Sequence, residues 1–180
     1  MTLNQIHSNK VIGVPLDCHT DAVLGDGDAL ISQNKNCALA VFVADCGNVG
    51  LIGDNGTIAV VHCGWRGLEN QILQKTVNEL TMTGANEIYS VIGPNIGPEC
   101  YEFGEEELNR LISLYGHNAR SKTADDKASL DINYCIESSL QELNVKLAFK
   151  IDDCTMCSGK FYSYRHDATP KRQAMILYFN

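Results

Sequence analysis

The stretch VVHCGWRG, from Val60 to Gly67, sets the expected architecture of this chain. The apolar run that ends at His62 is typical of a strand, and Gly64 then lets the backbone turn sharply into a helical pattern. The only tryptophan of the chain and an arginine follow at this corner. Free backbone N–H groups at a helix start favour anions, so the corner is a candidate functional site. The alternative is that these are ordinary core and surface residues.

Outward from this corner, short apolar runs alternate with helical patterns. Helices are expected after Gly67, after Gly104 and from Asp131, which is a suitable N-cap. The polar segment Ser121–Lys127 is expected to be a loop. This arrangement predicts an α/β sandwich of the α+β type, with mixed sheets and three main helices. The expected strands are Val11–Val14, Leu39–Ala44, Val49–Ile52, Thr57–His62, Ile88–Ile92, Ala148–Ile151, Phe161–Tyr164 and Ala174–Phe179.

Length, charge and composition limit the classes of protein to consider. The 180 residues, 44% of them hydrophobic, predict a single domain spanning 1–180. A net charge of −8 argues against a nucleic-acid partner held by phosphate contacts. No apolar run has the length of a membrane helix, and the first residues lack a signal-peptide core, so we expect a cytoplasmic protein without a membrane partner. Its eight cysteines are therefore expected to be mostly thiols.

Three residues of the types that bind zinc lie next to expected strands. Cys46 follows Asp45 just after the run Leu39–Ala44, and His7 lies with Gln5 just before the next run. Together with His62 they offer two imidazoles and one thiolate, which are ligands that zinc accepts. Three protein ligands with one open position are typical of a catalytic zinc site. A chain with five histidines and eight cysteines offers many such triples, so spacing alone does not decide.

A second cysteine pair, Cys154-x-x-Cys157, is open to three interpretations: a reduced buried pair, half of a zinc site, or a redox motif. A ribbon-type zinc site needs a second C-x-x-C, and the chain has none. The nucleic-acid deaminase signature needs a His-x-Glu, which is also absent. We therefore interpret the pair as structural. His19, His117 and His166 are expected to be surface or loop residues.

The motifs QIH, GDALIS, ADC, HCGWRG, IGPNIGPECYEFG, LDI, DDCT and FYSYRHD follow one another in this order. In combination they resemble the YfiH family, also called the laccase-domain or multicopper polyphenol oxidase family, over essentially the whole chain. The resemblance implies a sandwich fold related to a cysteine hydrolase. It also implies a zinc ion held by His7, Cys46 and His62. The segment before the Q-x-H motif is shorter here than is usual in the family.

The resemblance further implies an activity. Family members are similar to zinc-dependent purine nucleoside phosphorylases, which convert adenosine, inosine or S-methyl-5′-thioadenosine and phosphate into the free base and a ribose 1-phosphate, and which also deaminate adenosine. On this chain the expected catalytic residues are Cys46, His62, Arg66 and Asp45. The expected substrate ligands are Arg66, Arg165 and Gln5. The two arginines are suited to phosphate because a guanidinium binds two phosphate oxygens at once. The alternative role of Arg165 is that of a partner in a structural salt bridge. The alternative role of Asp45 is that of a turn residue.

Other functions stay open at this point. Cys46 and His62 are also suited to be the nucleophile and base of a hydrolase that acts on a peptidoglycan precursor or another amide. A non-catalytic nucleotide-binding protein is a third hypothesis. A polyphenol oxidase is ranked last, because the chain lacks clustered His-x-His motifs, and copper is accordingly ranked behind zinc. We expect a monomer or a small homo-oligomer.

Overall fold

A six-stranded mixed sheet forms the centre of the computed structural model, which describes residues 1–17 and 22–179. The strand order is β11-β8-β6-β7-β4-β2. The four inner strands pair antiparallel, whereas the two outermost pairs, β2 with β4 and β11 with β8, are parallel. The strands are β2 (Val11–Gly13), β4 (Ala29–Ser32), β6 (Gly47–Gly53), β7 (Ile58–Cys63), β8 (Ile88–Ile92) and β11 (Lys146–Lys150).

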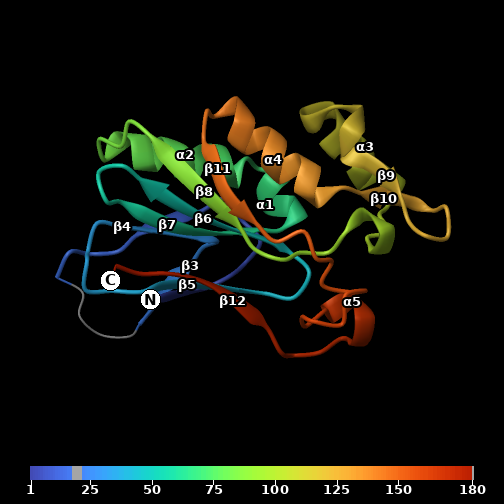
Figure 1. Ribbon diagram of the computed structural model, residues 1–180, viewed down its shortest axis with the longest axis horizontal. Helices are drawn as coiled ribbons and strands as arrows, with labels where there is room; N and C mark the ends of the chain where they lie inside the picture. Colours follow the sequence, from blue (N-terminus) through green and yellow to red (C-terminus); the bar gives the residue numbers. More distant parts are fainter. Residues whose placement is uncertain (18–21, 180) are drawn as a thin grey trace.

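Helices cover one face of this sheet and two short strand pairs cover the other (Figure 1). On the strand side, β1 pairs parallel with β3, and β5 pairs antiparallel with β12. These strands are β1 (Thr2–Asn4), β3 (Val23–Asp26), β5 (Leu39–Val43) and β12 (Gln173–Leu177). The helices are α1 (Trp65–Glu69), α2 (Ile72–Met82), α3 (Glu105–Tyr115) and α4 (Ile132–Glu142). The remaining elements are η1 (Pro98–Cys100), η2 (His117–Ala119), β9 (Arg120–Lys122), β10 (Ala128–Leu130) and α5 (Tyr164–Asp167).

Strand β7 is buried on both faces because layers cover it from both sides. Side chains alternate across a strand, so its neighbours along the chain enter different cores. Ala59 and Val61 lie in the core beneath the helices, whereas Ile58 and Val60 lie in the core beneath the short strands. This double burial explains why the run before His62 is continuously apolar.

The α+β sandwich predicted from the sequence is confirmed, and the three main helices lie where the periodicity placed them. Asp131 is the N-cap of α4, since its Oδ1 accepts a hydrogen bond from the Tyr134 backbone nitrogen at 2.9 Å. The first helical pattern is broken in two. The backbone of Gln71 has a φ of 61°, in the left-handed region, and this separates α1 from α2.

Two local predictions were wrong. Phe161–Tyr164 is not a strand; Tyr164 begins the short helix α5, which Ser163 caps by accepting a hydrogen bond from the His166 backbone nitrogen. Ser121–Lys127 is not wholly a loop, because its first residues belong to β9 of the β9–β10 hairpin. Polar residues form this strand because cross-strand backbone hydrogen bonds do not need an apolar face. Strands β1, β3, β4 and β10 were not predicted from the sequence.

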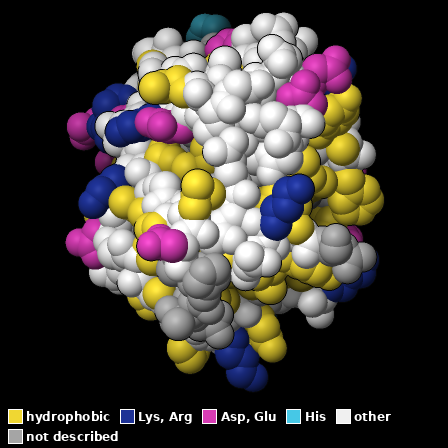
Figure 2. Space-filling model, turned by 90° about the vertical axis from the view of Figure 1, so that its left-hand side faces the viewer, with side chains coloured by type: hydrophobic (Ala, Val, Ile, Leu, Met, Phe, Trp, Pro, Cys, Tyr) yellow, Lys and Arg dark blue, Asp and Glu magenta, His cyan; other side chains and the backbone are white. Residues whose placement is uncertain are grey.

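Charged side chains of both signs are scattered over the end of the sandwich seen in Figure 2. Among the residues coloured by type there, lysines and arginines lie singly rather than in one basic patch. Such a patch is the usual footprint of a nucleic-acid partner. Within residues 1–17 and 22–179, every helix is too short or too polar to cross a membrane. Of the three histidines expected at the surface, His117 and His166 are exposed, and His19 lies outside the described residues.

Candidate metal centre

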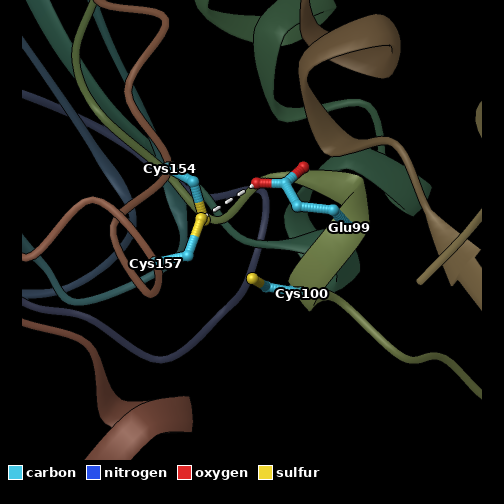
Figure 3. A group of neighbouring side chains, drawn as sticks. All are labelled: Glu99, Cys100, Cys154 and Cys157. Carbon is cyan, nitrogen blue, oxygen red and sulfur yellow. Dashed lines mark hydrogen bonds between the residues drawn. The ribbon is translucent and has the colours of Figure 1, made fainter. Parts of the chain in front are cut away.

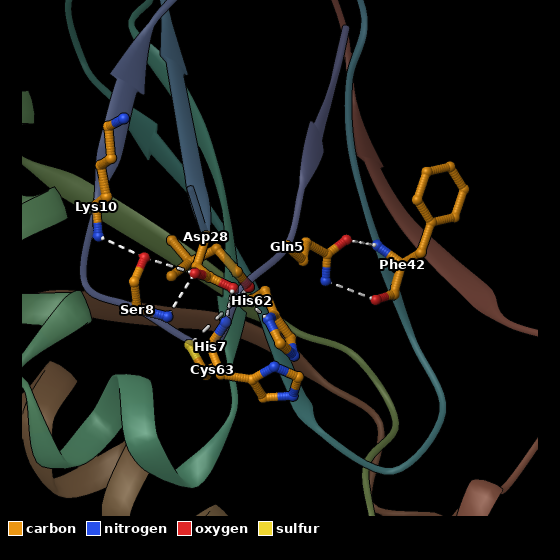
Figure 4. A network of polar contacts seen from close by, with 9 residues as sticks. Gln5, His7, Ser8, Lys10, Asp28, Phe42, His62 and Cys63 are labelled. Atoms are coloured by element: carbon orange, nitrogen blue, oxygen red, sulfur yellow. Dashed lines mark hydrogen bonds and ion pairs between the residues drawn. The ribbon is translucent and has the colours of Figure 1, made fainter. Parts of the chain in front are cut away.

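His7, Cys46 and His62 come together from three separate segments. Their ligand atoms all lie within 4.8 Å of one another. His7 lies in the connection between β1 and β2, Cys46 between β5 and β6, and His62 in β7. The two imidazole rings meet edge to face, with centroids 4.8 Å apart (Figure 4). The structure therefore brings together the three residues that the sequence singled out as metal ligands.

Asp28 organises two of these ligands, and the sequence analysis did not assign it a role. Its fully buried carboxylate lies 2.7 Å from Nδ1 of His62 and accepts a hydrogen bond from the His7 backbone nitrogen at 3.0 Å (Figure 4). Ser8 donates to the same carboxylate through its backbone nitrogen at 2.6 Å and its hydroxyl at 2.7 Å. With Nδ1 held by Asp28, Nε2 of His62 is left to face Cys46. Carboxylates orient histidine ligands of zinc in this way.

The charges of Asp28, His62 and Cys46 stabilise one another. Burial opposes ionisation of the Cys46 thiol, but hydrogen bonds and charge from His62 and His7 outweigh it and lower its pKa to about 6. Burial likewise opposes the charged form of His62, but Asp28 and Cys46 raise its pKa to about 9. Burial disfavours the charged form of Asp28 as well, yet hydrogen bonds from His62 and Ser8 lower its pKa to about 2. A thiolate is the form of cysteine that binds a metal.

The donor set and its surroundings fit a zinc ion. Two imidazoles and a thiolate are borderline-soft ligands, and three protein ligands leave one coordination position for water or substrate. Gly64 makes room for them. A Cβ atom at this position would lie 3.0 Å from Cδ2 of His7 and 3.5 Å from the Cys46 sulfur. This close approach is the structural reason for the glycine in the sequence HCGWRG.

An open cleft of about 550 Å³ has His7, Cys46 and His62 in its wall. Gln5 also lines this cleft. Its side-chain amide donates to the Phe42 carbonyl and accepts from the Phe42 backbone nitrogen, each at 2.8 Å, as a neighbouring strand would (Figure 4). The remaining lining residues are Phe42, Val43, Ala44, Tyr164 and Arg172. An exposed aromatic ring and a cation therefore line the same cleft as the three candidate metal ligands.

Tyr164 and Arg172 form the wall that the sequence analysis missed. The Arg172 guanidinium lies 5.8 Å from the centre of the Tyr164 ring. Its Nη1 donates to the backbone carbonyls of Thr169 at 2.7 Å and Lys171 at 2.8 Å, which fixes its position. Tyr164 belongs to the FYSYRHD motif, but the expected strand there obscured its role. Nothing in the local sequence of Arg172 distinguishes it from a surface cation.

Asp45 lies next to Cys46 but uses its side chain to hold the C-terminal part of the chain. Its carboxylate accepts hydrogen bonds of 2.7 Å from the Thr155 hydroxyl and from the Arg165 backbone nitrogen. Its φ of 95° is rare for a residue with a side chain. Strain of this kind persists where the surrounding structure fixes it, often at functional sites.

The two arginines expected to bind substrate lie outside the residues that line the cleft. The guanidinium of Arg66 stacks 4.2 Å from the centre of the Trp65 ring. That of Arg165 lies 5.2 Å from the centre of the Tyr101 ring and donates to the carbonyl of Glu102 at 3.1 Å. Both guanidiniums contribute to the electrostatic environment of the Tyr101 phenol, as Cys46 does, and burial raises the pKa of that phenol well above its usual range.

Comparisons with known proteins identify the family of this chain and agree with its fold. The model of the family described as multi-copper polyphenol oxidoreductase laccase matches residues 1–180. A protein of Clostridium acetobutylicum named purine nucleoside phosphorylase is 34% identical over 171 residues, which are 92% of this chain and 70% of that protein. A protein of the same name from Aquifex aeolicus is 31% identical over 170 residues, covering 89% of this chain and 79% of that protein.

A solved structure shares the fold. The crystal structure of the Bacillus licheniformis hypothetical protein YfiH superimposes with a TM-score of 0.86 over 98% of this chain and 73% of that chain, at 22% identity. The match of the family over the whole chain and the identity to curated relatives lead to one conclusion. The chain belongs to the multicopper polyphenol oxidoreductase laccase family, also known as the YfiH family.

Proposed function

We propose that this protein is a zinc-dependent purine nucleoside phosphorylase that also deaminates adenosine. The observation that carries the proposal is the convergence of His7, Cys46 and His62 in a cleft that Tyr164 and Arg172 also line. The names of the relatives in Clostridium acetobutylicum and Aquifex aeolicus support the phosphorylase activity. The proposed substrates are adenosine, inosine and S-methyl-5′-thioadenosine, each with phosphate.

Different side chains are proposed to hold the metal ion and to bind the substrate. His7, Cys46 and His62 would hold the zinc ion, and Asp28 keeps His62 in the orientation that ligation needs. A zinc ion held by these residues would supply Lewis-acid activation of water, which is the chemistry needed to replace the amino group of adenosine. His7, Cys46 and His62 all line the cleft, so a purine bound in the cleft would lie next to these three side chains.

We assign recognition of the nucleoside and of phosphate to Tyr164 and Arg172, which line the same cleft. The exposed ring of Tyr164 offers a face on which a purine base stacks. Arg172 offers N–H groups that bind phosphate oxygens while a phosphate oxygen forms its bond to C1′ and the bond from C1′ to the base nitrogen breaks. Arg66 and Arg165 remain proposed substrate ligands, second to Arg172 because they lie outside the cleft lining. We propose that Gln5 acts by holding the cleft edge, and Asp45 by positioning Cys46.

A product assay tests the proposal. Zinc-loaded protein is incubated with inosine or adenosine, with and without phosphate, and bases and nucleosides are separated by chromatography. We expect hypoxanthine from inosine only when phosphate is present, together with ribose 1-phosphate. His7→Ala removes one ligand from an exposed position and should abolish the product. His117→Ala, a histidine equally exposed on the helix side, is the matched control and should retain it. Absence of free base from zinc-loaded protein with every purine nucleoside would overturn the proposal.

One observation favours a second candidate, an amide hydrolase. Cys46, His62 and Asp28 form a chain in the order nucleophile, base and orienting carboxylate, as in cysteine hydrolases. The two candidates make opposite demands on Cys46, because a zinc-bound thiolate is not a free nucleophile. If the hydrolase were correct, amide cleavage should be fastest in chelator-treated protein and zinc should inhibit it. If phosphorolysis is correct, the same chelator should remove the activity and zinc should restore it.

A further inference from the structure

A second group of metal-binding side chains lies away from the candidate metal centre. Glu99 and Cys100 belong to the short helix η1, and Cys154 and Cys157 belong to the loop that follows β11 (Figure 3). One carboxylate oxygen and three sulfur atoms all lie within 4.8 Å of one another. This explains the isolated C-x-x-C motif. Its partners are supplied by a segment more than fifty positions earlier in the chain rather than by a second C-x-x-C.

The composition and spacing of this group match one kind of ion. Sulfur-rich tetrahedral sites are typical of zinc, and ligands at a Zn–S distance of about 2.3 Å stand about 3.8 Å apart. The four ligand atoms already lie within 4.8 Å of one another, so small side-chain rotations would bring them to that separation. We propose that Glu99, Cys100, Cys154 and Cys157 bind a second, structural zinc ion through three thiolates and one carboxylate.

The backbone prepares Cys154 for this role. The Gly97 backbone nitrogen donates a hydrogen bond to the Cys154 sulfur at 3.1 Å, which fixes the position of the sulfur atom. Cys154 is itself buried and fixed by a bridge to Asn95, whose carbonyl also accepts a hydrogen bond from the Thr155 nitrogen at 3.0 Å. One ligand is therefore held in place before any ion binds.

The carboxylate is also brought to the sulfur atoms by a particular feature of the chain. A Cβ atom at Gly97 would lie 2.3 Å from one carboxylate oxygen of Glu99, so the glycine leaves room for this side chain to fold back. In that position Glu99 accepts a hydrogen bond from the Cys157 thiol at 3.4 Å (Figure 3). Zinc would replace this hydrogen bond, and the proton of each thiol would leave to solvent.

The second ion would stabilise the surroundings of the first. The C-x-x-C loop carries Thr155, whose hydroxyl donates to Asp45 at 2.7 Å, and Asp45 precedes Cys46 directly. A zinc ion that ties this loop to η1 therefore fixes one of the contacts that hold the first ligand loop. The proposal concerns binding and stability alone, so it does not depend on the activity proposed above.

Cobalt(II) spectroscopy of the full chain separates the two sites. Cys46→Ala removes the only thiolate of the first centre, so any thiolate-to-cobalt absorption left in this variant comes from the second group. We expect that absorption to persist, with visible bands typical of tetrahedral cobalt, and to bleach on addition of one equivalent of zinc. Adding Cys157→Ser, an exposed position, should lower the near-ultraviolet intensity by about a third or more. Adding Cys37→Ser instead, a thiol outside both groups, should leave it unchanged.

Zinc content and thermal stability test the second site independently of cobalt spectroscopy. Metal analysis should find two zinc ions in the wild-type chain and one in Cys46→Ala, and Glu99→Gln in that background should weaken zinc binding at least tenfold. Glu106→Gln, an exposed helix residue, is its control. Zinc should raise the Tm of Cys46→Ala but not that of the double variant with Cys157→Ser. Cobalt absorption that vanishes in Cys46→Ala, a cysteine disulfide within the group that persists in reductant, or an iron–sulfur absorption in purified protein would each overturn the proposal.

Discussion

Replacing Asp28 by asparagine tests whether this buried carboxylate holds the candidate metal centre together. Asparagine keeps the shape but loses the charge, and its amide nitrogen cannot accept one of the hydrogen bonds from His62 and Ser8. At about 1.4 kcal/mol per tenfold change in proton affinity, lowering the pKa of Asp28 from 3.8 to about 2 corresponds to about 2 kcal/mol of stability. For a chain of this size that amount should lower the Tm by about 4 to 8 °C.

The sign of the pH dependence is part of the same prediction. The folded protein depresses the pKa of Asp28, so its contribution is present above about pH 4 and is lost as the pH falls towards about 2. Urea unfolding of zinc-free protein at pH 7 and at pH 3 should therefore show a wild-type advantage over Asp28→Asn that shrinks at the lower pH.

Zinc affinity is the second assay for this variant. Removing a carboxylate that orients a histidine ligand should weaken zinc binding by about 10- to 100-fold, measured by competition with a chromophoric chelator. Asp26→Asn is the matched control, because Asp26 lies two positions earlier, is exposed, and accepts a hydrogen bond from the Asn4 side chain. An Asp28→Asn variant with wild-type zinc affinity and wild-type stability would refute the role assigned to this residue.

Three further predictions concern the same cleft. Gly64→Ala places a methyl group 3.0 Å from the His7 ring, so zinc affinity measured by chelator competition should fall about tenfold while circular dichroism stays unchanged; unaltered affinity would contradict the close packing. Tyr164→Ala should raise the KM for inosine about tenfold in the product assay by removing about 1.4 kcal/mol of stacking, whereas Tyr178→Ala, exposed outside the cleft, should not. In zinc-free protein, alkylation of Cys46, followed by peptide mass spectrometry, should rise with pH to half its maximum near pH 6, because only the thiolate reacts; a midpoint near pH 9 or no protection by zinc would contradict the assigned environment.

Periodicity predicted the helices, and motif order predicted which three residues come together at the candidate metal centre. Helices α2, α3 and α4 each bury one apolar stripe, which local spacing reveals. His7, Cys46 and His62 lie in separate motifs, and it was the resemblance to a family rather than their spacing that placed them in one set. The run before His62 was predictable as a strand because both of its faces are buried.

Residues that act through distant contacts could not be predicted from local sequence. Asp28 stands at the start of β4, and only the pairing of β4 with β7 brings it to His62. Glu99 and Cys100 reach the C-x-x-C loop because the Asn95–Cys154 bridge aligns two remote segments. An acidic residue directly before the apolar run Ala29–Ile31 was the one signal for Asp28 that the sequence offered. The sequence Phe161–Tyr164 looked like a strand because its aromatic residues favour strands, but caps and turns decide its conformation.

The order of the cleft residues along the chain separates two tasks. All three candidate metal ligands lie between residues 7 and 62. Tyr164 and Arg172, which line the same cleft, lie near the other end of the chain. The two groups meet because β12 pairs with β5, the strand that leads towards Cys46. Exchanging residues 161–172 between relatives should therefore change which nucleoside is accepted without altering metal affinity. If the proposed function is correct, relatives with this architecture can differ in the nucleoside they accept while they keep the same three metal-binding residues.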